Sequence, residues 1–128
     1  MYHKEPPLNP KRFRSPQIQI PIEKAELGYI AGLIDGEGCL TKNNGRWRLQ
    51  IAMTDEPVIN WLGKMGGTVR ERSVKGNRQR CWRWLVMRQV ELRILLLALL
   101  PYLMVKHDQA TKVLNELNTE LRDIWSPS

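Results

Sequence analysis

The sequence predicts an α+β fold in which two antiparallel hairpins are covered by helices on one face, in the order α-β-β-α-β-β-α-α. Apolar residues alternate with period two in two segments, and turn residues divide each segment into a pair of strands. Helical apolar patterns precede and follow each pair. At 128 residues, the chain is expected to form one domain over residues 23–128, preceded by a Pro-rich basic arm over residues 1–22.

The first helix is predicted from Glu23, because Pro21 lies just upstream and acidic residues occupy the first turn. Ala25, Gly28 and Gly32 recur three and four residues apart and give this helix one small face. Glycine costs a helix about 1 kcal/mol relative to alanine, so a face that carries two of them indicates close packing against another backbone. Two partners remain open: a helix of the same chain, or the first helix of a second copy.

The first hairpin is expected over Gly38 to Asn43 and Arg46 to Met53, joined by an Asn-Gly turn. A helix over Glu56 to Met65 follows. We expect Asp55 to cap its start and Gly66-Gly67 to end it.

The second hairpin is expected over Thr68 to Ser73 and Gln79 to Met87, with a turn at residues 75–77. A Leu-rich helix, Val90 to Leu100, comes next. An amphipathic helix, Asp108 to Trp125, completes the order.

Positive charge is concentrated in the middle of the chain. The sequence has 20 Lys and Arg against 13 Asp and Glu, a formal net charge of +7. Residues 42–88 hold eleven of the bases and three of the acids, so this segment carries +8 and the remainder −1. A local surplus made mostly of arginine indicates a polyanionic partner, and a solvated basic surface is the alternative.

Membrane and secreted proteins are disfavoured. The longest apolar run, Ile94 to Leu100, is far shorter than the roughly 18 to 20 residues that span a bilayer. The N-terminus has no apolar signal-peptide core, so we expect a cytoplasmic protein with no membrane partner. Cys39 and Cys81 lack C-x-x-C spacing and are expected to be reduced thiols.

The alternation in the strands separates an apolar face from a polar one. Trp47, Leu49 and Ile51 fall on the face expected to meet the helices. Arg and Gln side chains can hydrogen-bond base edges in the major groove of DNA, and a β-ribbon can enter that groove. The opposite face is therefore predicted to contact DNA, through Arg46, Arg48, Gln50, Arg70, Arg72 and Arg83.

The stretch IAGLIDGEGCL, residues 30–40, places two acids among glycines. Asp35 is expected to end the first helix in a structural role, and Glu37 to lie two residues beyond it, beside the arginine-bearing sheet. A carboxylate at that position repels nucleic acid unless a cation lies between them. Mg²⁺ is the expected cation, because it binds few carboxylates and accepts phosphate oxygens as ligands. The alternative is that both acids only solvate a turn. A two-fold pair of chains would bring two Glu37 carboxylates together.

Residues Ile30 to Gly38 resemble the signature of the LAGLIDADG homing endonucleases. The likeness extends over residues 23–125, through the order of helices and strands and the segments TVRER (68–72) and LPYLMVKHDQA (100–110). The resemblance implies a saddle-shaped sheet over the DNA major groove. It also implies a homodimer that cuts both strands of a pseudo-palindromic site, in the cytoplasm or in an organellar or phage setting with access to DNA.

The resemblance also implies roles for single residues. Glu37 would bind a divalent metal, Mg²⁺ or another such as Mn²⁺, and Gly36 would offer its backbone carbonyl to the same ion. Lys106 falls on the family's basic residue near the catalytic water, and no small-molecule cofactor is expected. The dimer interface would be the small face of Ala25, Gly28 and Gly32. The base or phosphate contacts would be Asn43, Arg46, Arg48, Gln50, Arg70, Arg72 and Arg83, with Lys75, Arg78 and Arg80 as phosphate contacts.

Two features depart from the family pattern. The metal-binding acid is Glu where Asp is commoner. Met53 stands where many members carry a Gln that arranges water, so that role would be absent or moved to Thr54 or Gln50. A metal-dependent DNA endonuclease remains the expected function. The alternatives are a weak or inactive DNA-binding relative or an RNA maturase; the arginine-lined strands disfavour a protein-interaction domain.

Overall fold

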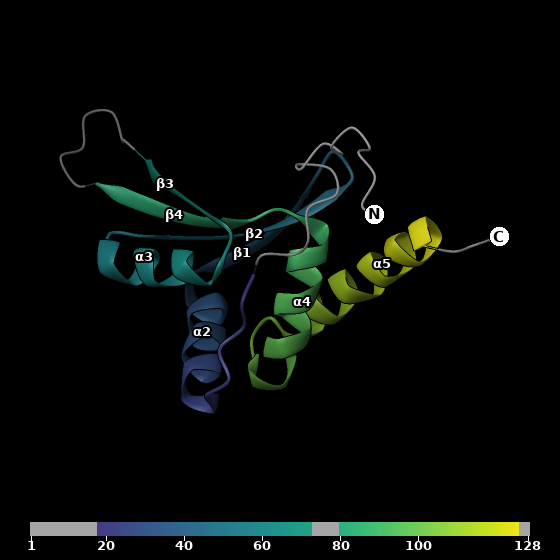
Figure 1. The fold of residues 1–128 in the computed structure, drawn as a ribbon, viewed down its shortest axis with the longest axis horizontal. Coiled ribbons are helices and arrows are strands. Elements are labelled where there is room, and N and C mark those ends of the chain that lie inside the picture. Colours follow the sequence, from purple (N-terminus) through teal and green to yellow (C-terminus); the bar gives the residue numbers. More distant parts are fainter. Residues whose placement is uncertain (1–17, 73–79, 126–128) are drawn as a thin grey trace, which may run out of the picture.

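The computed structural model of the protein describes residues 18–72 and 80–125. The helices and strands follow the predicted order, with a short 3₁₀ helix, η1, between the last two helices (Figure 1). The elements are α2 Lys24–Glu37, β1 Gly38–Asn43, β2 Arg46–Met53, α3 Glu56–Met65, β3 Thr68–Arg72, β4 Cys81–Val86, α4 Gln89–Leu99, η1 Leu100–Tyr102 and α5 His107–Trp125.

The four strands form one antiparallel sheet in the order β1-β2-β4-β3. Figure 1 shows α2, α3 and α4 on one side of this sheet, while no described helix covers the other side. The predicted α+β class, with an antiparallel sheet covered by helices on one face, is therefore confirmed. One half-exposed face is what an antiparallel sheet of alternating sequence allows.

The β1–β2 hairpin is closed by Asn44 and Gly45, with φ angles of 54° and 78°. Two successive residues with positive φ are typical of a type I′ turn, whose twist matches that of the two strands it joins. Asn43 pairs with Arg46 beside the turn, and both predicted strands are confirmed at their ends.

The turn from α3 into β3 is where glycine is indispensable. Gly67 has φ +73°, and a β-carbon added to it would lie 2.6 Å from the Leu85 carbonyl oxygen and 2.7 Å from the Trp84 indole nitrogen. The same indole N–H donates a hydrogen bond to the Gly66 carbonyl at 2.8 Å. The turn therefore needs glycine for its backbone conformation and also for space.

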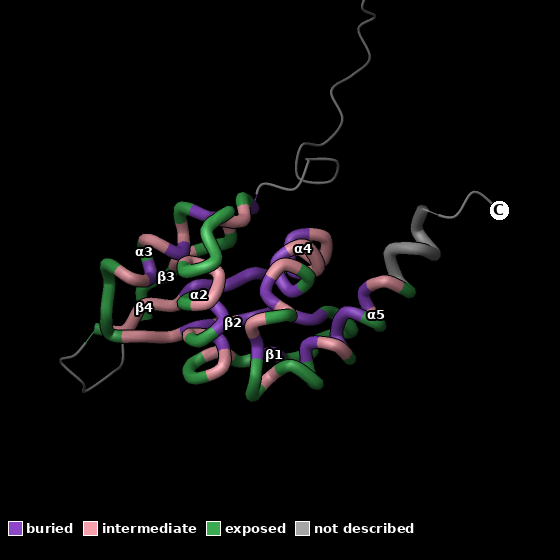
Figure 2. Tube along the Cα trace, turned by 90° about the horizontal axis from the view of Figure 1, so that it is seen from below, coloured by how far each residue is buried: buried purple, intermediate pink, exposed green. Residues whose placement is uncertain are grey.

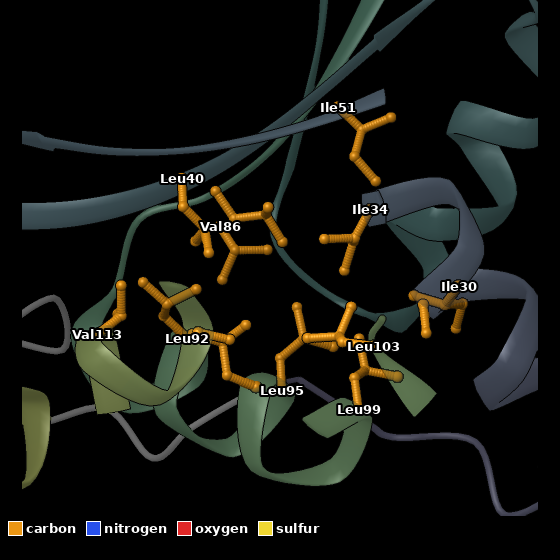
Figure 3. Close-up of a cluster of buried hydrophobic side chains, with 14 of the residues drawn as sticks. Ile30, Ile34, Leu40, Ile51, Val86, Leu92, Leu95, Leu99, Leu103 and Val113 are labelled. Carbon is orange, nitrogen blue, oxygen red and sulfur yellow. The ribbon is translucent and has the colours of Figure 1, made fainter. Parts of the chain in front are cut away.

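The hydrophobic core lies between the sheet and the helices (Figure 3). Ile34 of α2, Ile51 of β2 and Leu95 and Leu99 of α4 meet there, each fully buried. In Figure 2, buried positions run along β2, α4 and the first part of α5. Truncation of one such aliphatic side chain to alanine costs about 2–5 kcal/mol, so this layer fixes the sheet on the helices.

Three helices have bounds that differ slightly from the prediction. The Gly38 N–H donates to the Ile34 carbonyl, so α2 continues through Glu37, and Glu37 ends the helix instead of lying beyond it. α4 begins and ends one residue earlier than predicted. α5 begins at His107, because helical hydrogen bonding already starts with the bond from the Ala110 N–H to the preceding loop.

The second hairpin pairs antiparallel from Thr68 opposite Leu85 to Arg72 opposite Cys81. The predicted end of its first strand, its turn at 75–77 and the predicted start of its second strand at Gln79 lie outside the described residues. β4 ends at Val86, one residue before the predicted end, because the chain turns into α4 there.

Residues 18–22, the part of the predicted arm that the structure describes, run onto the end of α3. Ile18 is buried, and the Gln19 N–H donates to the Met65 carbonyl at 2.7 Å. Asp55 caps the other end of α3 as predicted, accepting the Val58 N–H at 3.1 Å. No helix among the described residues is both long and apolar enough to cross a membrane.

Candidate functional site

Cross-strand pairing gathers the arginines of three strands on the uncovered side of the sheet, which we call the open face. Residues directly opposite in antiparallel strands point to the same side, so the register defines the members of this face. None of those members is acidic. They are Cys39, Thr41, Asn43, Arg46, Arg48, Gln50, Ala52, Thr68, Arg70, Arg72, Cys81, Arg83 and Leu85.

The predicted DNA contacts on the open face differ in exposure. Asn43, Arg46, Arg70 and Arg72 are exposed. Arg48, Gln50 and Arg83 are half-buried.

Two arginines face each other near the centre of the open face. Arg83 lies directly opposite Arg70, and among the described residues its guanidinium hydrogen-bonds only to the Gln50 amide oxygen, at 3.5 Å. The Nε atoms of Arg48 and Arg83 are buried and have no hydrogen-bond partner among the described residues. Like charges opposite one another destabilise a sheet, so this centre is suited to an anion.

Of the remaining predicted phosphate contacts, the structure describes Arg80, which directly precedes β4. Arg80 is exposed and forms an ion pair with Glu71 at 3.2 Å. Such an exposed pair is weak and exchanges easily for another anion. Lys75 and Arg78 lie outside the described residues.

Glu37 and Gly36 end α2 beside β1, and both are exposed. A β-carbon added at Gly36 would meet no described atom within 4 Å, so the last turn of the helix is open on that side. Gly38 makes the junction: a β-carbon there would lie 2.6 Å from the Ile34 carbonyl oxygen. The glycine that the turn requires is therefore Gly38, whereas Gly36 adopts ordinary helical geometry.

Asp35 has a different role from Glu37, although only one residue separates them. Its carboxylate accepts the N–H of Met104 at 2.8 Å and that of Lys106 at 3.0 Å. Partial burial raises the pKa of Asp35, but hydrogen bonds from Met104, Lys106 and Val105 outweigh it and hold the pKa below its ordinary value. Asp35 therefore fastens a distant loop to α2, in the structural role that the sequence predicts.

Lys106 is brought to the same place by this loop. Its ammonium donates to the Asp35 backbone carbonyl at 2.9 Å, although 71 residues separate the two. Gln109, in the first turn of α5, donates to the Leu40 carbonyl of β1 at 3.2 Å. The fold thus holds the Lys106 ammonium at the last turn of α2, on the carbonyl of a residue two positions before Glu37.

The metal ligands available to one chain are few. Among the side chains that the structure describes, within residues 18–72 and 80–119, no group of three His, Cys, Asp or Glu could hold an ion. Asp35 is occupied by backbone donors, which leaves the exposed Glu37 carboxylate and the Gly36 carbonyl. An ion that keeps several waters and takes phosphate oxygens, as Mg²⁺ does, suits such a sparse set.

The small face of α2 points away from the described part of its own chain. A β-carbon added at Gly28 or Gly32 would meet no described atom within 4 Å, and Ala25 is exposed. No helix in the described part of the chain packs closely against this face, and a second copy as its partner stays a prediction. Beside this face, a pocket of about 370 Å³ lies over Tyr29 and Trp61, whose rings meet edge to face at 5.7 Å.

Met53 lies on the covered face of the sheet, packed against the core and paired with Trp82. It therefore does not project toward the open face, and it offers no group that orders water. Gln50 does lie on the open face, but its amide oxygen faces Arg83.

Comparison with known proteins adds evidence on the fold. No protein-family model matches the sequence, and no curated protein matches it. Solved structures do match. The homing endonuclease I-CvuI in complex with its target in the presence of Ca has a TM-score of 0.63 and 24% identity, over 78% of this chain and 70% of that chain.

Two further structures agree. I-CvuI in complex with the I-CreI target in the presence of Mg, with DNA not cleaved, gives a TM-score of 0.59 and 22% identity over 74% of this chain and 67% of that chain. The archaeal intron-encoded homing endonuclease I-Vdi141I complexed with DNA gives a TM-score of 0.61 and 19% identity, over 77% of this chain and 70% of that chain. The chain has the homing-endonuclease fold.

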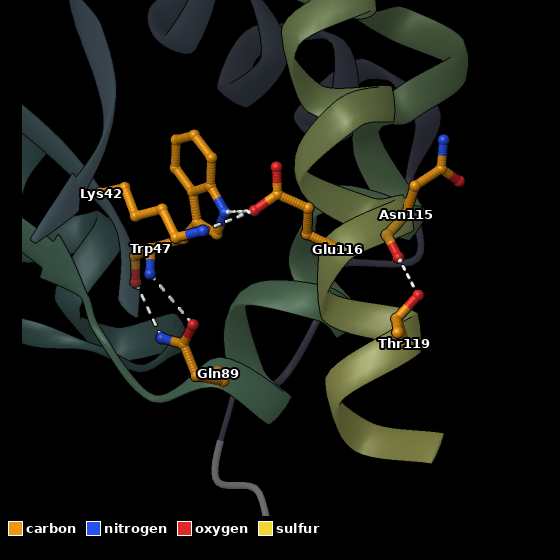
Figure 4. Close-up of polar contacts among 6 residues, drawn as sticks. All are labelled: Lys42, Trp47, Gln89, Asn115, Glu116 and Thr119. Carbon is orange, nitrogen blue, oxygen red and sulfur yellow. Dashed lines mark hydrogen bonds and ion pairs between the residues drawn. The ribbon is translucent and has the colours of Figure 1, made fainter. Parts of the chain in front are cut away.

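Within this homing-endonuclease fold, sequence reasoning missed four residues that hold the first hairpin. Lys42, Trp47, Gln89 and Glu116 come from four different elements and meet at its outer end (Figure 4). A Glu on an amphipathic helix and a Gln at a helix start give no signal of a contact that lies 42 to 74 residues away. Cys39 and Cys81 are free thiols, as predicted.

Proposed function

We propose that this protein is a site-specific DNA endonuclease that hydrolyses both strands of a pseudo-palindromic site as a homodimer, with a divalent cation. One observation carries the proposal: an exposed carboxylate, Glu37, and a tethered ammonium, Lys106, stand at the edge of an arginine-bearing face that has no acid of its own. A protein that only bound DNA would gain nothing from an acid at that edge. The homing-endonuclease fold, seen with DNA in the neighbouring structures, supports the same conclusion.

The open face would bind double-stranded DNA. Exposed Arg46, Arg70 and Arg72 can reach phosphates or guanine edges, and the central Arg83 is aimed by Gln50. The half-buried Arg48 and Arg83 guanidinium groups in the centre would gain phosphate or base partners through their accessible atoms. Binding would therefore relieve repulsion within the protein, which gives affinity for any duplex before sequence is read.

Glu37 and the Gly36 carbonyl would hold Mg²⁺ or Mn²⁺ together with phosphate oxygens. When bound, the ion would lower the pKa of a coordinated water and stabilise charge at the scissile phosphate. Lys106 would place a positive charge beside the attacked phosphate and hold a hydrogen bond to the nucleophilic water. Asp35 would keep Lys106 there by fixing residues 104–106 to α2.

The small face of α2 would be the dimer interface. Ala25, Gly28 and Gly32 let two helices approach closely, and a two-fold axis between them brings two Glu37 carboxylates together, one for each DNA strand. Gly32→Leu tests this: light scattering should give a dimer mass for the wild type and a monomer mass for the variant. The variant should keep its fold, since the new side chain meets no described atom at its base. A monomeric wild type would contradict the interface.

One observation favours a second candidate, a DNA-binding relative or RNA maturase with weak cleavage or none. Met53 occupies the place where a Gln that arranges water is expected, and its side chain packs against the core. The same open face would then bind nucleic acid without efficient hydrolysis.

The decisive experiment uses Glu37→Gln, which keeps the size of the side chain and removes its charge. Duplexes that bind the full chain are first selected from a randomised library in EDTA, and are then incubated with Mg²⁺. We expect the wild type to cut both strands, and the variant to bind as tightly or more tightly without cutting. Cutting by the variant would refute the role of Glu37, and a wild type that binds without cutting would favour the second candidate.

A further inference from the structure

The outer end of the first hairpin lacks the support that the rest of the sheet has. β4 ends at Val86, which pairs with Leu49, so residues 41–48 extend past it as a two-stranded ribbon. Two-stranded hairpins are marginally stable in water. Yet this ribbon carries Arg46 and Arg48, two of the predicted DNA contacts. Its position relative to the rest of the open face must therefore be fixed by other elements.

Gln89, the first residue of α4, takes the place of the missing strand. Its amide oxygen accepts the Trp47 N–H at 3.1 Å, and its amide nitrogen donates to the Trp47 carbonyl at 2.8 Å. The same nitrogen donates to the Met87 carbonyl at 2.8 Å, which orients the amide. A side chain thus continues the β2–β4 ladder beyond the end of β4, at one residue of the ribbon.

Glu116 of α5 holds the same residue from the covered side (Figure 4). One carboxylate oxygen accepts the Trp47 indole N–H at 2.9 Å and the Lys42 ammonium at 2.8 Å. Lys42 also lies 5.7 Å from the centre of the Trp47 ring. Both strands of the ribbon, through Lys42 on β1 and Trp47 on β2, are thereby tied to one carboxylate.

We propose that Glu116 and Gln89 are positioning residues that hold the outer end of the first hairpin in the place from which Arg46 and Arg48 contact DNA. Trp47 lies between these two arginines, and its side chain points to the face opposite theirs. Holding the Trp47 backbone and ring therefore sets where both arginines stand. This inference rests on the proposed function for its DNA-binding part only.

The energetics favour a positioning role over general support of the fold. The Lys42 and Glu116 side chains are 44% and 33% exposed, and ion pairs this exposed contribute little to the free energy of folding. The core beneath has its own fully buried aliphatic layer. Loss of the Glu116 contacts should therefore loosen the ribbon without unfolding the domain.

The first test measures amide hydrogen exchange of the full chain by mass spectrometry. Glu116→Leu removes both hydrogen bonds, Glu116→Gln keeps an acceptor for the indole, and Glu23→Gln removes the same charge at the far end of α2. We expect severalfold faster exchange at residues 40–48 in Glu116→Leu, a smaller change in Glu116→Gln and none in Glu23→Gln. Exchange in α2 and α4 should be unchanged, and an unchanged ribbon would overturn the inference.

The second test measures the affinity of the same variants for a short random-sequence duplex over a series of salt concentrations. If the ribbon arginines lose their phosphate contacts, the salt slope of Glu116→Leu should be smaller than that of the wild type by about one for each lost contact. Partial unfolding alone would lower the active fraction without changing the slope. A faster-exchanging ribbon with an unchanged slope would therefore show a structural role only, and overturn positioning.

The two tests separate this inference from the proposed function. A wild type that fails to bind any duplex at low salt would refute the DNA-binding function, and the role of the ribbon toward DNA with it. The exchange data would still decide whether Glu116 holds the ribbon. A duplex-binding wild type that does not cleave would leave positioning intact.

Discussion

Each hairpin of the sheet has a tryptophan whose indole N–H donates one hydrogen bond, but the acceptors differ. Trp84 of the second hairpin donates to the Gly66 carbonyl, 18 residues away, in a turn crowded around a glycine. Trp47 of the first hairpin donates to the Glu116 carboxylate, 69 residues away on α5. The second hairpin is thus held by local backbone geometry, and the first by an ionisable side chain from a distant helix.

This difference bears on function because both hairpins carry arginines to the open face. A contact made by backbone and steric fit is insensitive to salt and pH. A contact made by an exposed carboxylate responds to both. The first hairpin is therefore the part of the open face whose position we expect to change without unfolding of the protein.

The largest expected effect comes from the turn that holds the second hairpin. Gly67→Ala should lower the free energy of unfolding by about 2–4 kcal/mol, because positive φ and contact with Leu85 and Trp84 both oppose a β-carbon. Gly45→Ala is the matched control: its φ is also positive, but the space around it is open, so the loss should be about 1 kcal/mol. Urea unfolding measures both, and equal losses would show that steric fit does not hold the second hairpin.

Removal of one positive charge from the same hairpin should change the free energy of unfolding by a smaller amount, and in the opposite direction. Arg70 lies opposite Arg83, whereas Arg46 lies opposite Asn43. Arg70→Gln should therefore raise the free energy of unfolding by roughly 0.2–1 kcal/mol, and Arg46→Gln should leave it nearly unchanged. Thermal unfolding of the free protein compares them. A destabilised Arg70→Gln would mean that the two guanidinium groups do not repel each other.

The smallest effect is the pH dependence of the first hairpin. Hydrogen bonds from Lys42 and the Trp47 indole hold the pKa of Glu116 below its ordinary value of 4.5. Its stabilisation is present in full above that value, and is lost as the pH falls through the lower pKa of the folded state.

The urea midpoints of the wild type and Glu116→Gln should therefore differ near neutral pH and converge as the pH falls below the ordinary pKa of 4.5 and through the lower pKa of the folded state. Asp35, whose pKa is also lowered, contributes equally to both proteins and cancels. A difference that stays constant over this range would mean that the Glu116 charge does not hold the hairpin.

Local patterns in the sequence determined the helices and strands, the arginine-bearing face and the Asn-Gly turn. These patterns are the alternation of apolar and polar residues, the helix cap at Asp55 and the paired turn residues. Each acts over a few residues, so it can be interpreted without knowledge of the fold. Helix ends were predicted less accurately: α2 includes Glu37, because the hydrogen bond from Gly38 to Ile34 depends on a close approach that only glycine permits.

The tertiary structure decided how the two acids are set apart and what stands beside them. The sequence predicted a structural role for Asp35 and a site role for Glu37, but only the fold shows the cause: backbone donors 69 and 71 residues away hold Asp35, whereas Glu37 is exposed. The same loop brings the Lys106 ammonium to the Asp35 carbonyl, and α5 places the Glu116 carboxylate beside the Trp47 indole. No local pattern encodes such contacts, since each depends on how the helices pack beneath the sheet. The sequence by itself determined which residues could act, and packing determined which of them meet.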